Sequence, residues 1–164
     1  MPFKNLLSSL PDTKRKISAR KFKKTSKIVK ISKKFGRDYF DGTREFGYGG
    51  YKYDGRWKPV AKDIIKFFKL NKNHKVLDIG CAKGFLVKEL LDEGINAFGI
   101  DISSYAIKNC HPDVVGRVSI ANANQLFFAK SSFDAVISIN CIHNLKLSGC
   151  KMAIKEIMRV SKGN

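Results

Sequence analysis

The chain has 164 residues, of which 43% are apolar, and its formal net charge is +18. That length and apolar content predict one domain built around a single hydrophobic core. No apolar run reaches the roughly 18 residues that a membrane-spanning helix needs, and the first residues, MPFKNLLSSLPD, lack the continuous apolar stretch of a signal peptide.

The positive charge is concentrated in an N-terminal extension, residues 1–35. Residues 1–37 hold thirteen Lys or Arg residues and a single acid, Asp12. Residues 13–35 contain no Pro or Gly, so we expect a basic helix there. Such an extension could contact nucleic acid or an anionic membrane. It could also be a solvated, lysine-rich helix, which the excess of Lys over Arg favours.

Residues 36–58 change character to GRDYFDGTREFGYGGYKYDGRWK, which is rich in glycine and aromatic residues. Glycine makes the backbone of such a segment permissive, so we expect a loop. Its aromatic side chains either pack over the core or line a ligand site as a lid.

From residue 59 to residue 164 helical and strand patterns alternate. Pro59 opens a predicted helix over 59–69, and 71–74 form a turn. We then expect strands at 75–79, 95–100, 116–120 and 133–139, with helices at 84–93, 103–109 and 147–160. This order predicts an α/β fold, a Rossmann-like doubly wound parallel sheet of about four strands. The chain ends where a further strand is expected, so we expect this domain to be incomplete.

The turn VLDIGCAKGF, residues 76–85, follows the first predicted strand. In an open parallel sheet, ligands bind beyond the carboxyl ends of the strands, and small residues let a ligand approach the backbone. Asp101 ends the second strand and can accept hydrogen bonds from ribose hydroxyls. The dinucleotide fingerprint would need a small residue at Phe85. Asp78 also suits an ammonium group better than a pyrophosphate. S-adenosylmethionine fits this pattern. It has no phosphate, its cationic amino-acid end suits Asp78, and its adenosine end suits Asp101.

The segments VLDIGCAKGFL, GIDIS and FDAVISINCIHNL resemble motifs of the class I S-adenosylmethionine-dependent methyltransferases of the type 11 kind. The lead-in at 36–65 resembles that of some bacterial members. The resemblance implies that the cofactor lies against Asp78, Gly80, Ala82, Lys83, Gly84, Asp101, Ile102, Asn122, Ala123 and Asn140. Ala82 stands where the family usually has glycine, and Asn122 where it often has an acid.

On that resemblance, Ala82 and Lys83 contact the cofactor through their backbone, Asp101 holds the ribose, and Ile102 packs on the adenine. Asn122 and Ala123 face the adenine amino group.

Two residues after the fourth strand are candidates for the chemistry. Asn140 would lie near the transferred methyl group. His143 is either a general base for the acceptor or a histidine that fixes the loop. We assign Cys141 no nucleophilic role, because no Pro-Cys loop surrounds it. Four aromatic residues could cover the cofactor and shape the acceptor pocket: Tyr48, Tyr51, Tyr53 and Trp57.

The four cysteines show neither CxxC pairs nor a histidine spacing typical of zinc sites. We therefore expect free thiols, a cytoplasmic setting and no metal. Three functions stay open: a methyltransferase for a small molecule, an RNA methyltransferase gripping its substrate with the basic arm, and an inactive cofactor-binding fragment with exposed apolar surface along its fourth strand.

Overall fold

The computed structural model describes residues 4–11 and 25–163 of the chain. Within them, four parallel strands form one sheet in the order β3-β2-β1-β4. The strands are β1 (Lys75–Ile79), β2 (Asn96–Asp101), β3 (Val118–Ile120) and β4 (Ala135–Ile137). This confirms the predicted α/β architecture of about four parallel strands, with β1 placed on the predicted residues.

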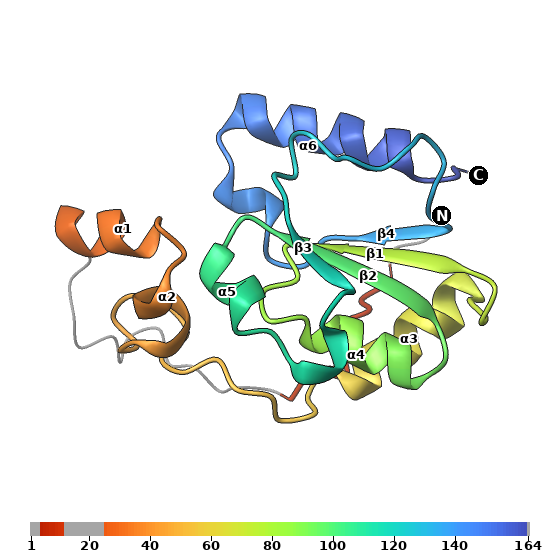
Figure 1. The fold of residues 1–164 in the computed structure, drawn as a ribbon, viewed down its shortest axis with the longest axis horizontal. Helices are drawn as coiled ribbons and strands as arrows, with labels where there is room; N and C mark the ends of the chain where they lie inside the picture. The colour runs from red at the N-terminus through yellow and green to blue at the C-terminus, as the bar shows by residue number, and fades with distance from the viewer. Residues whose placement is uncertain (1–3, 12–24, 164) are drawn as a thin grey trace.

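Helices cover both faces of this sheet (Figure 1). One face carries α3 (Lys58–Phe68) and α4 (Phe85–Asp92), and the other carries α6 (Leu147–Val160). Figure 1 also places α1 (Ser26–Ser32) and α2 (Arg37–Asp41) together at one end of the sheet, beside α5 (Ser104–Lys108). Two 3-10 turns, η2 (Pro112–Val114) and η3 (Ile142–Asn144), complete the elements of the described residues.

The helix ends follow local rules that the sequence shows. Pro59 occupies the first turn of α3, where its missing N–H costs nothing. Ser103 caps α5, because its side chain accepts a hydrogen bond from the Ala106 amide. Gly94 takes a φ of 79° just beyond α4, the left-handed conformation that stops a helix.

The sheet buries apolar side chains on both faces. Val76 and Ala97 belong to the core beneath α3 and α4, while Leu77 and Ile100 belong to the core beneath α6. On the edge strand β4, Ala135 and Ile137 are buried. The helix α6 that covers this part of the sheet exposes four apolar side chains: Leu147, Met152, Ile154 and Met158.

The N-terminal segment differs from the predicted basic helix over 13–35. Residues 12–24 lie outside the described part, and α1 covers only Ser26–Ser32. The helix stops before Phe35, which takes a left-handed φ of 48°. Upstream, Leu6, Leu7 and Leu10 pack against the main core, so residues 6–10 contribute to the folded domain.

The predicted loop over 36–58 contains a short helix, α2, that its glycine content concealed. Residues 42–57 otherwise run without helix or strand. We call residues 35–57 the strap. They include α2 and lead to α3, and their aromatic side chains lie against the carboxyl end of β1. No helix of the described residues is long and apolar enough to cross a membrane.

Candidate functional site

The carboxyl ends of β1 and β2 place two acids on either side of one backbone turn. Asp78 lies near the end of β1 and Asp101 is the last residue of β2. Between them, Gly80, Ala82 and Gly84 take positive φ values of 82°, 53° and 75°. The amides of Gly80 and Cys81 both donate to the Ile100 carbonyl, at 2.8 and 3.0 Å. The turn is therefore held tightly to the neighbouring strand.

The glycines of this turn are needed for a reason that differs from our prediction. A Cβ on Gly80 would lie 2.6 Å from the Cys141 Sγ, and one on Gly84 would lie 2.7 Å from Val114 Cγ2. The space beside these two glycines is thus filled by the protein itself rather than left open for a ligand. Their positive φ values and close packing explain the small residues, and the ligand must approach from another direction.

Asp101 holds the turn in place from the second strand. Its Oδ2 accepts the Ala82 amide at 2.8 Å, and its Oδ1 accepts the Ser103 amide at 2.8 Å. Burial raises the pKa of Asp101, while these backbone hydrogen bonds lower it. Each carboxylate oxygen has a further lone pair, so the side chain can still accept hydrogen bonds from ribose hydroxyls.

Asp78 is a buried acid without a partner. Its side chain is 5% exposed, and no hydrogen-bond donor reaches its carboxylate within residues 4–11 and 25–163. Burial, followed by the nearby charge of Asp101, raises the pKa of Asp78 to about 7. A cationic group placed beside this carboxylate would favour its ionised form.

A cavity of about 40 Å³ opens against Asp78 and the turn. The strand ends and the turn supply one wall and the strap supplies the other. Its lining residues are Tyr48, Tyr51, Trp57, Asp78, Gly80, Cys81, Ala82, Leu86, Ile139 and Asn140. The aromatic loop therefore does both things considered for it, since it packs on the domain and lines the candidate site.

The strap aromatics are fixed by packing among themselves and on α4. Tyr51 stacks on Phe85 with ring centroids 4.8 Å apart, and Tyr48 lies 4.4 Å from Tyr51. Burial, followed by the charges of Tyr39 and Asp101, raises the pKa of Tyr48 to about 12. Tyr53 lies outside the cavity lining, and its hydroxyl donates to the buried Glu89 Oε1 at 2.6 Å. Three of the four predicted aromatic residues thus line the cavity.

The side of the site that was predicted to face adenine is open. Ile102 is 55% exposed, and Asn122 is exposed while Ala123 is buried. The Asn122 Oδ1 accepts the Asn124 amide at 3.0 Å, which shapes the corner after β3. Arg159 on α6 supports this corner by donating to the carbonyls of Leu126 and Phe128.

The residues after β4 are placed unequally. Asn140 lines the cavity and takes a left-handed φ of 54°. His143 lies exposed in η3, outside the cavity lining. No described residue hydrogen-bonds to its ring, so its role as a base stays a prediction. Burial and the charge of Asp101 raise the pKa of Cys141 to about 11, and a protonated thiol is a poor nucleophile.

Lys83 is the predicted site residue whose side chain the sequence could not place. Its Nζ turns away from the turn and contacts both oxygens of Asp41 at 2.7 Å. Only its backbone is left for a ligand. Asp41 carried no signal in the sequence, because its partner lies 42 positions away. In the described part of the chain, no group of three His, Cys, Asp or Glu side chains could hold a metal ion.

Comparisons with known proteins agree with this geometry. Residues 77–164 match the family described as a methyltransferase domain. The chain is 30% identical over 99 residues to an uncharacterized methyltransferase of Schizosaccharomyces pombe, covering 57% of this chain and 37% of the relative. It spans less than half the length of the curated relatives it matches.

Two solved structures are also similar. A SAM-dependent methyltransferase of Methanosarcina mazei is 32% identical with a TM-score of 0.53, covering 60% of this chain and 51% of that one. A protein of Pyrococcus horikoshii is 26% identical with a TM-score of 0.60, covering 76% of this chain and 57% of that one.

Proposed function

The chain belongs to the methyltransferase domain family, and on that premise we propose that it transfers a methyl group from S-adenosyl-L-methionine to a small-molecule acceptor. The observation that carries the proposal is the unpartnered, buried carboxylate of Asp78, which faces a cavity beside the turn. That carboxylate suits a cation. A pyrophosphate beside it would be repelled.

The residues present fit the cofactor at both of its ends. Asp78 and the turn would hold the amino-acid end, with the backbone of Ala82 and Lys83 facing it. Asp101 would accept hydrogen bonds from the ribose hydroxyls, and the exposed Ile102 would pack against the adenine. The solved relative from Methanosarcina mazei, described as SAM-dependent, supports this assignment.

The protein has little covalent chemistry to do. When bound, the cofactor supplies a methyl carbon that its sulfonium makes electrophilic. The chain must orient an acceptor and exclude water from the reacting groups. Asn140 and the strap residues Tyr48 and Tyr51 surround the cavity and are placed for both tasks. His143 would take a proton from the acceptor only after the η3 turn brings its ring inward.

We favour a small acceptor because the cavity is small and enclosed by aromatic side chains from the strap. A cytoplasmic setting also belongs to this proposal, since all four cysteines are free thiols.

Titration calorimetry with S-adenosylhomocysteine tests the proposal. We expect micromolar binding of this product and no measurable binding of NAD⁺ under the same conditions. Binding of NAD⁺ in place of S-adenosylhomocysteine would contradict the assignment.

A second candidate function, methylation of RNA, is favoured by the charge around α1. Five exposed basic residues there have no ion-pair partner in the described part of the chain: Lys27, Lys30, Lys33, Lys34 and Arg37. Neutralising several phosphates would give RNA binding a steep salt dependence.

Substitution of lysines distinguishes the two candidates without removing residues that pack on the core. The test variant changes Lys27, Lys30, Lys33 and Lys34 to Gln. The matched control changes four exposed lysines elsewhere to Gln: Lys130, Lys146, Lys151 and Lys155. If RNA is the acceptor, only the first variant loses RNA affinity and flattens the salt dependence. Equal, weak RNA binding by both variants and the wild type would rule RNA out.

A further inference from the structure

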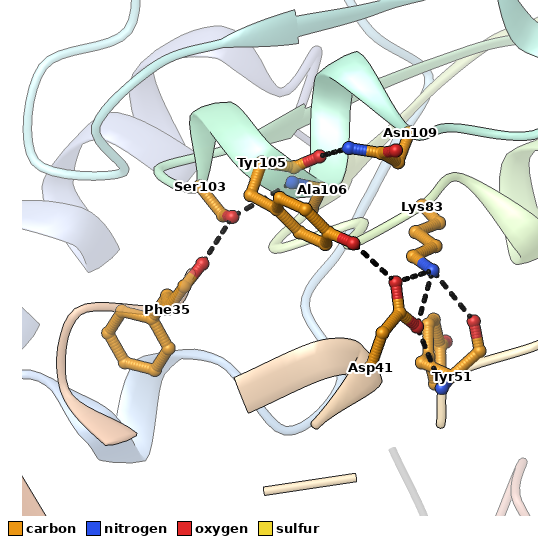
Figure 2. Close-up of polar contacts among 8 residues, drawn as sticks. All are labelled: Phe35, Asp41, Tyr51, Lys83, Ser103, Tyr105, Ala106 and Asn109. Carbon is orange, nitrogen blue, oxygen red and sulfur yellow. Dashed lines mark hydrogen bonds and ion pairs between the residues drawn. The ribbon is translucent and has the colours of Figure 1, made fainter. Parts of the chain in front are cut away.

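Asp41, the last residue of α2, joins three separate segments through one carboxylate (Figure 2). Both of its oxygens accept from the Lys83 ammonium at 2.7 Å. Its Oδ2 also accepts the Tyr105 hydroxyl at 2.7 Å, and its Oδ1 accepts the Tyr51 amide at 3.3 Å. The strap, the turn after β1 and helix α5 therefore meet at this side chain.

Both side-chain partners of Asp41 adjoin the residues proposed to hold the cofactor. Lys83 lies between Ala82 and Gly84 in the turn. Tyr105 lies in the first turn of α5, directly after the segment that Asp101 anchors. A second link runs beside the first, since the Ser103 hydroxyl donates to the Phe35 carbonyl at 2.5 Å. The strap is thus tied to both sides of the cofactor crevice.

The Lys83 end of the link is shielded from water, which makes it stronger than a fully exposed ion pair. The Lys83 and Asp41 side chains are 10% and 28% exposed. Lys83 Nζ also donates to the Tyr51 carbonyl at 3.1 Å, so its three N–H groups are all used. Burial would raise the pKa of Asp41, but hydrogen bonds from Lys83 and Tyr105 hold it below its usual range. Removing the Asp41 charge would leave a buried ammonium without its counter-ion.

Backbone hydrogen bonds within the strap connect its aromatic residues to α2, which ends at Asp41. The Tyr48 amide donates to the Tyr39 carbonyl at 2.8 Å, and the Gly50 amide donates to the Phe40 carbonyl at 3.1 Å. Tyr48 and Tyr51, which close the cavity, lie within the same cross-linked segment. The cavity holds about 40 Å³, far below the roughly 300–1,000 Å³ of typical small-molecule sites. Displacement of Tyr48 and Tyr51 would widen this cavity for a ligand's amino-acid end.

We propose that Asp41 is a positioning residue that latches the strap over the methionine end of the cofactor, so that opening of the Asp41–Lys83–Tyr105 cluster limits cofactor release. This inference rests on the proposed function. It concerns only ligands that carry an amino-acid end. A ligand made of the adenosine part alone occupies the open side of the crevice and does not need the latch.

The chain offers its own probe for this proposal. Trp57 is its single tryptophan, and it lines the cavity, so fluorescence changes report on this site. We would measure S-adenosylhomocysteine release by stopped-flow fluorescence, and the affinity of 5′-methylthioadenosine, which lacks the amino-acid end, by equilibrium titration. The variants are Asp41→Asn, Tyr105→Phe and the matched control Asp38→Asn, an exposed acid on the same helix.

A hydrogen bond to a charged group is worth about tenfold or more in an equilibrium or rate constant. We expect Asp41→Asn to speed release of S-adenosylhomocysteine at least tenfold, and Tyr105→Phe to speed it about threefold. Asp38→Asn should stay within twofold of the wild type, and methylthioadenosine affinity within twofold in every variant.

Wild-type release rates in both Asp41→Asn and Tyr105→Phe would overturn the latch. So would an equal loss of methylthioadenosine affinity, because that result indicates general disruption of the site. If Asp41→Asn does not fold, Tyr105→Phe, which removes one hydroxyl, decides the matter alone. Failure of the wild type to bind S-adenosylhomocysteine would instead overturn the proposed function, and this inference with it.

Discussion

The two ends of the candidate crevice differ in how they are covered. At the proposed adenosine end, Ile102 and Ile120 are 55% and 50% exposed and lie outside the cavity lining. At the proposed methionine end, Asp78 is buried and Tyr48, Tyr51 and Trp57 line the cavity. The first end is thus an open surface that could bind adenosine, and the second end is a partly enclosed cavity. Water exclusion matters where the methyl group is transferred, and the shielded end is where the structure provides it.

We expect the largest effect from substitution of Asp101, whose carboxylate is proposed to bind the ribose at the open end. Asp101→Ala should weaken binding of both S-adenosylhomocysteine and 5′-methylthioadenosine about 100-fold, because each loses two charge-assisted hydrogen bonds to the ribose. Calorimetry of both ligands checks this, with Asp38→Ala as control. A circular dichroism melt shows whether the turn that Asp101 anchors is still folded. If the variant loses affinity for only one of the two ligands, Asp101 does not bind the ribose that both ligands contain.

Substitution at the closed end should separate the two ligands. Asp78→Asn should weaken S-adenosylhomocysteine about thirtyfold, since a buried counter-charge for its ammonium is lost, and leave methylthioadenosine within twofold. Calorimetry at pH 8 measures both affinities. Equal losses for the two ligands would show that Asp78 does not mark the methionine end.

The same variant should be more stable than the wild type without ligand. The folded-state pKa of Asp78, about 7, lies above its ordinary value of 3.8. The stability contributed by the protonated carboxyl group is therefore full below about pH 4 and is lost progressively as pH rises to about 7, at a total cost on the order of 4 kcal/mol. We expect Asp78→Asn to melt several degrees higher than the wild type at pH 8, with a smaller gain at pH 5 and none near pH 3.

The pH dependence of binding should also differ between the ends. Because the ligand ammonium favours ionised Asp78, wild-type affinity for S-adenosylhomocysteine should rise about tenfold from pH 6 to pH 8. Methylthioadenosine affinity should stay flat over that range. A titration series at several pH values measures both profiles, and a flat profile for S-adenosylhomocysteine would argue against a charged partner for Asp78.

The smallest effect concerns the turn that both ends share. Ala82→Gly relieves a left-handed backbone that alanine adopts at a φ of 53°, but it also removes a buried methyl group packed near Phe40. These terms oppose one another, so we expect stability to change by less than about 1 kcal/mol. Urea denaturation measures this, and a larger loss would mean that the methyl group matters more than the strain.

The sequence predicted the residues of the open, proposed adenosine end better than those of the closed, proposed methionine end. Strand periodicity and the acids at strand ends located β1, β2 and the turn, because those signals are local. The strap has no periodicity, and its position depends on contacts such as Asp41 with Lys83 and Tyr53 with Glu89. The two residues of each pair lie far apart in the chain, so no local sequence pattern predicts their contact.

Glycine in the turn illustrates the same limit. Its spacing correctly predicted a turn of small residues after β1, and the positive φ values of that turn explain the small residues through local backbone sterics. The presence of Cys141 against Gly80 depends on how β4 and η3 return to the turn, which the spacing does not encode. The same course of the chain after β4 leaves His143 exposed in η3.

The central claim is that a turn flanked by two acids binds a nucleoside with a cationic amino-acid end rather than a pyrophosphate. A crystal structure of the protein soaked with S-adenosylhomocysteine tests it most directly. We predict density with the ribose hydroxyls on Asp101 and the ammonium beside Asp78, beneath Tyr48 and Tyr51. An empty crevice in that crystal, together with NAD⁺ bound in a parallel soak, would contradict the account.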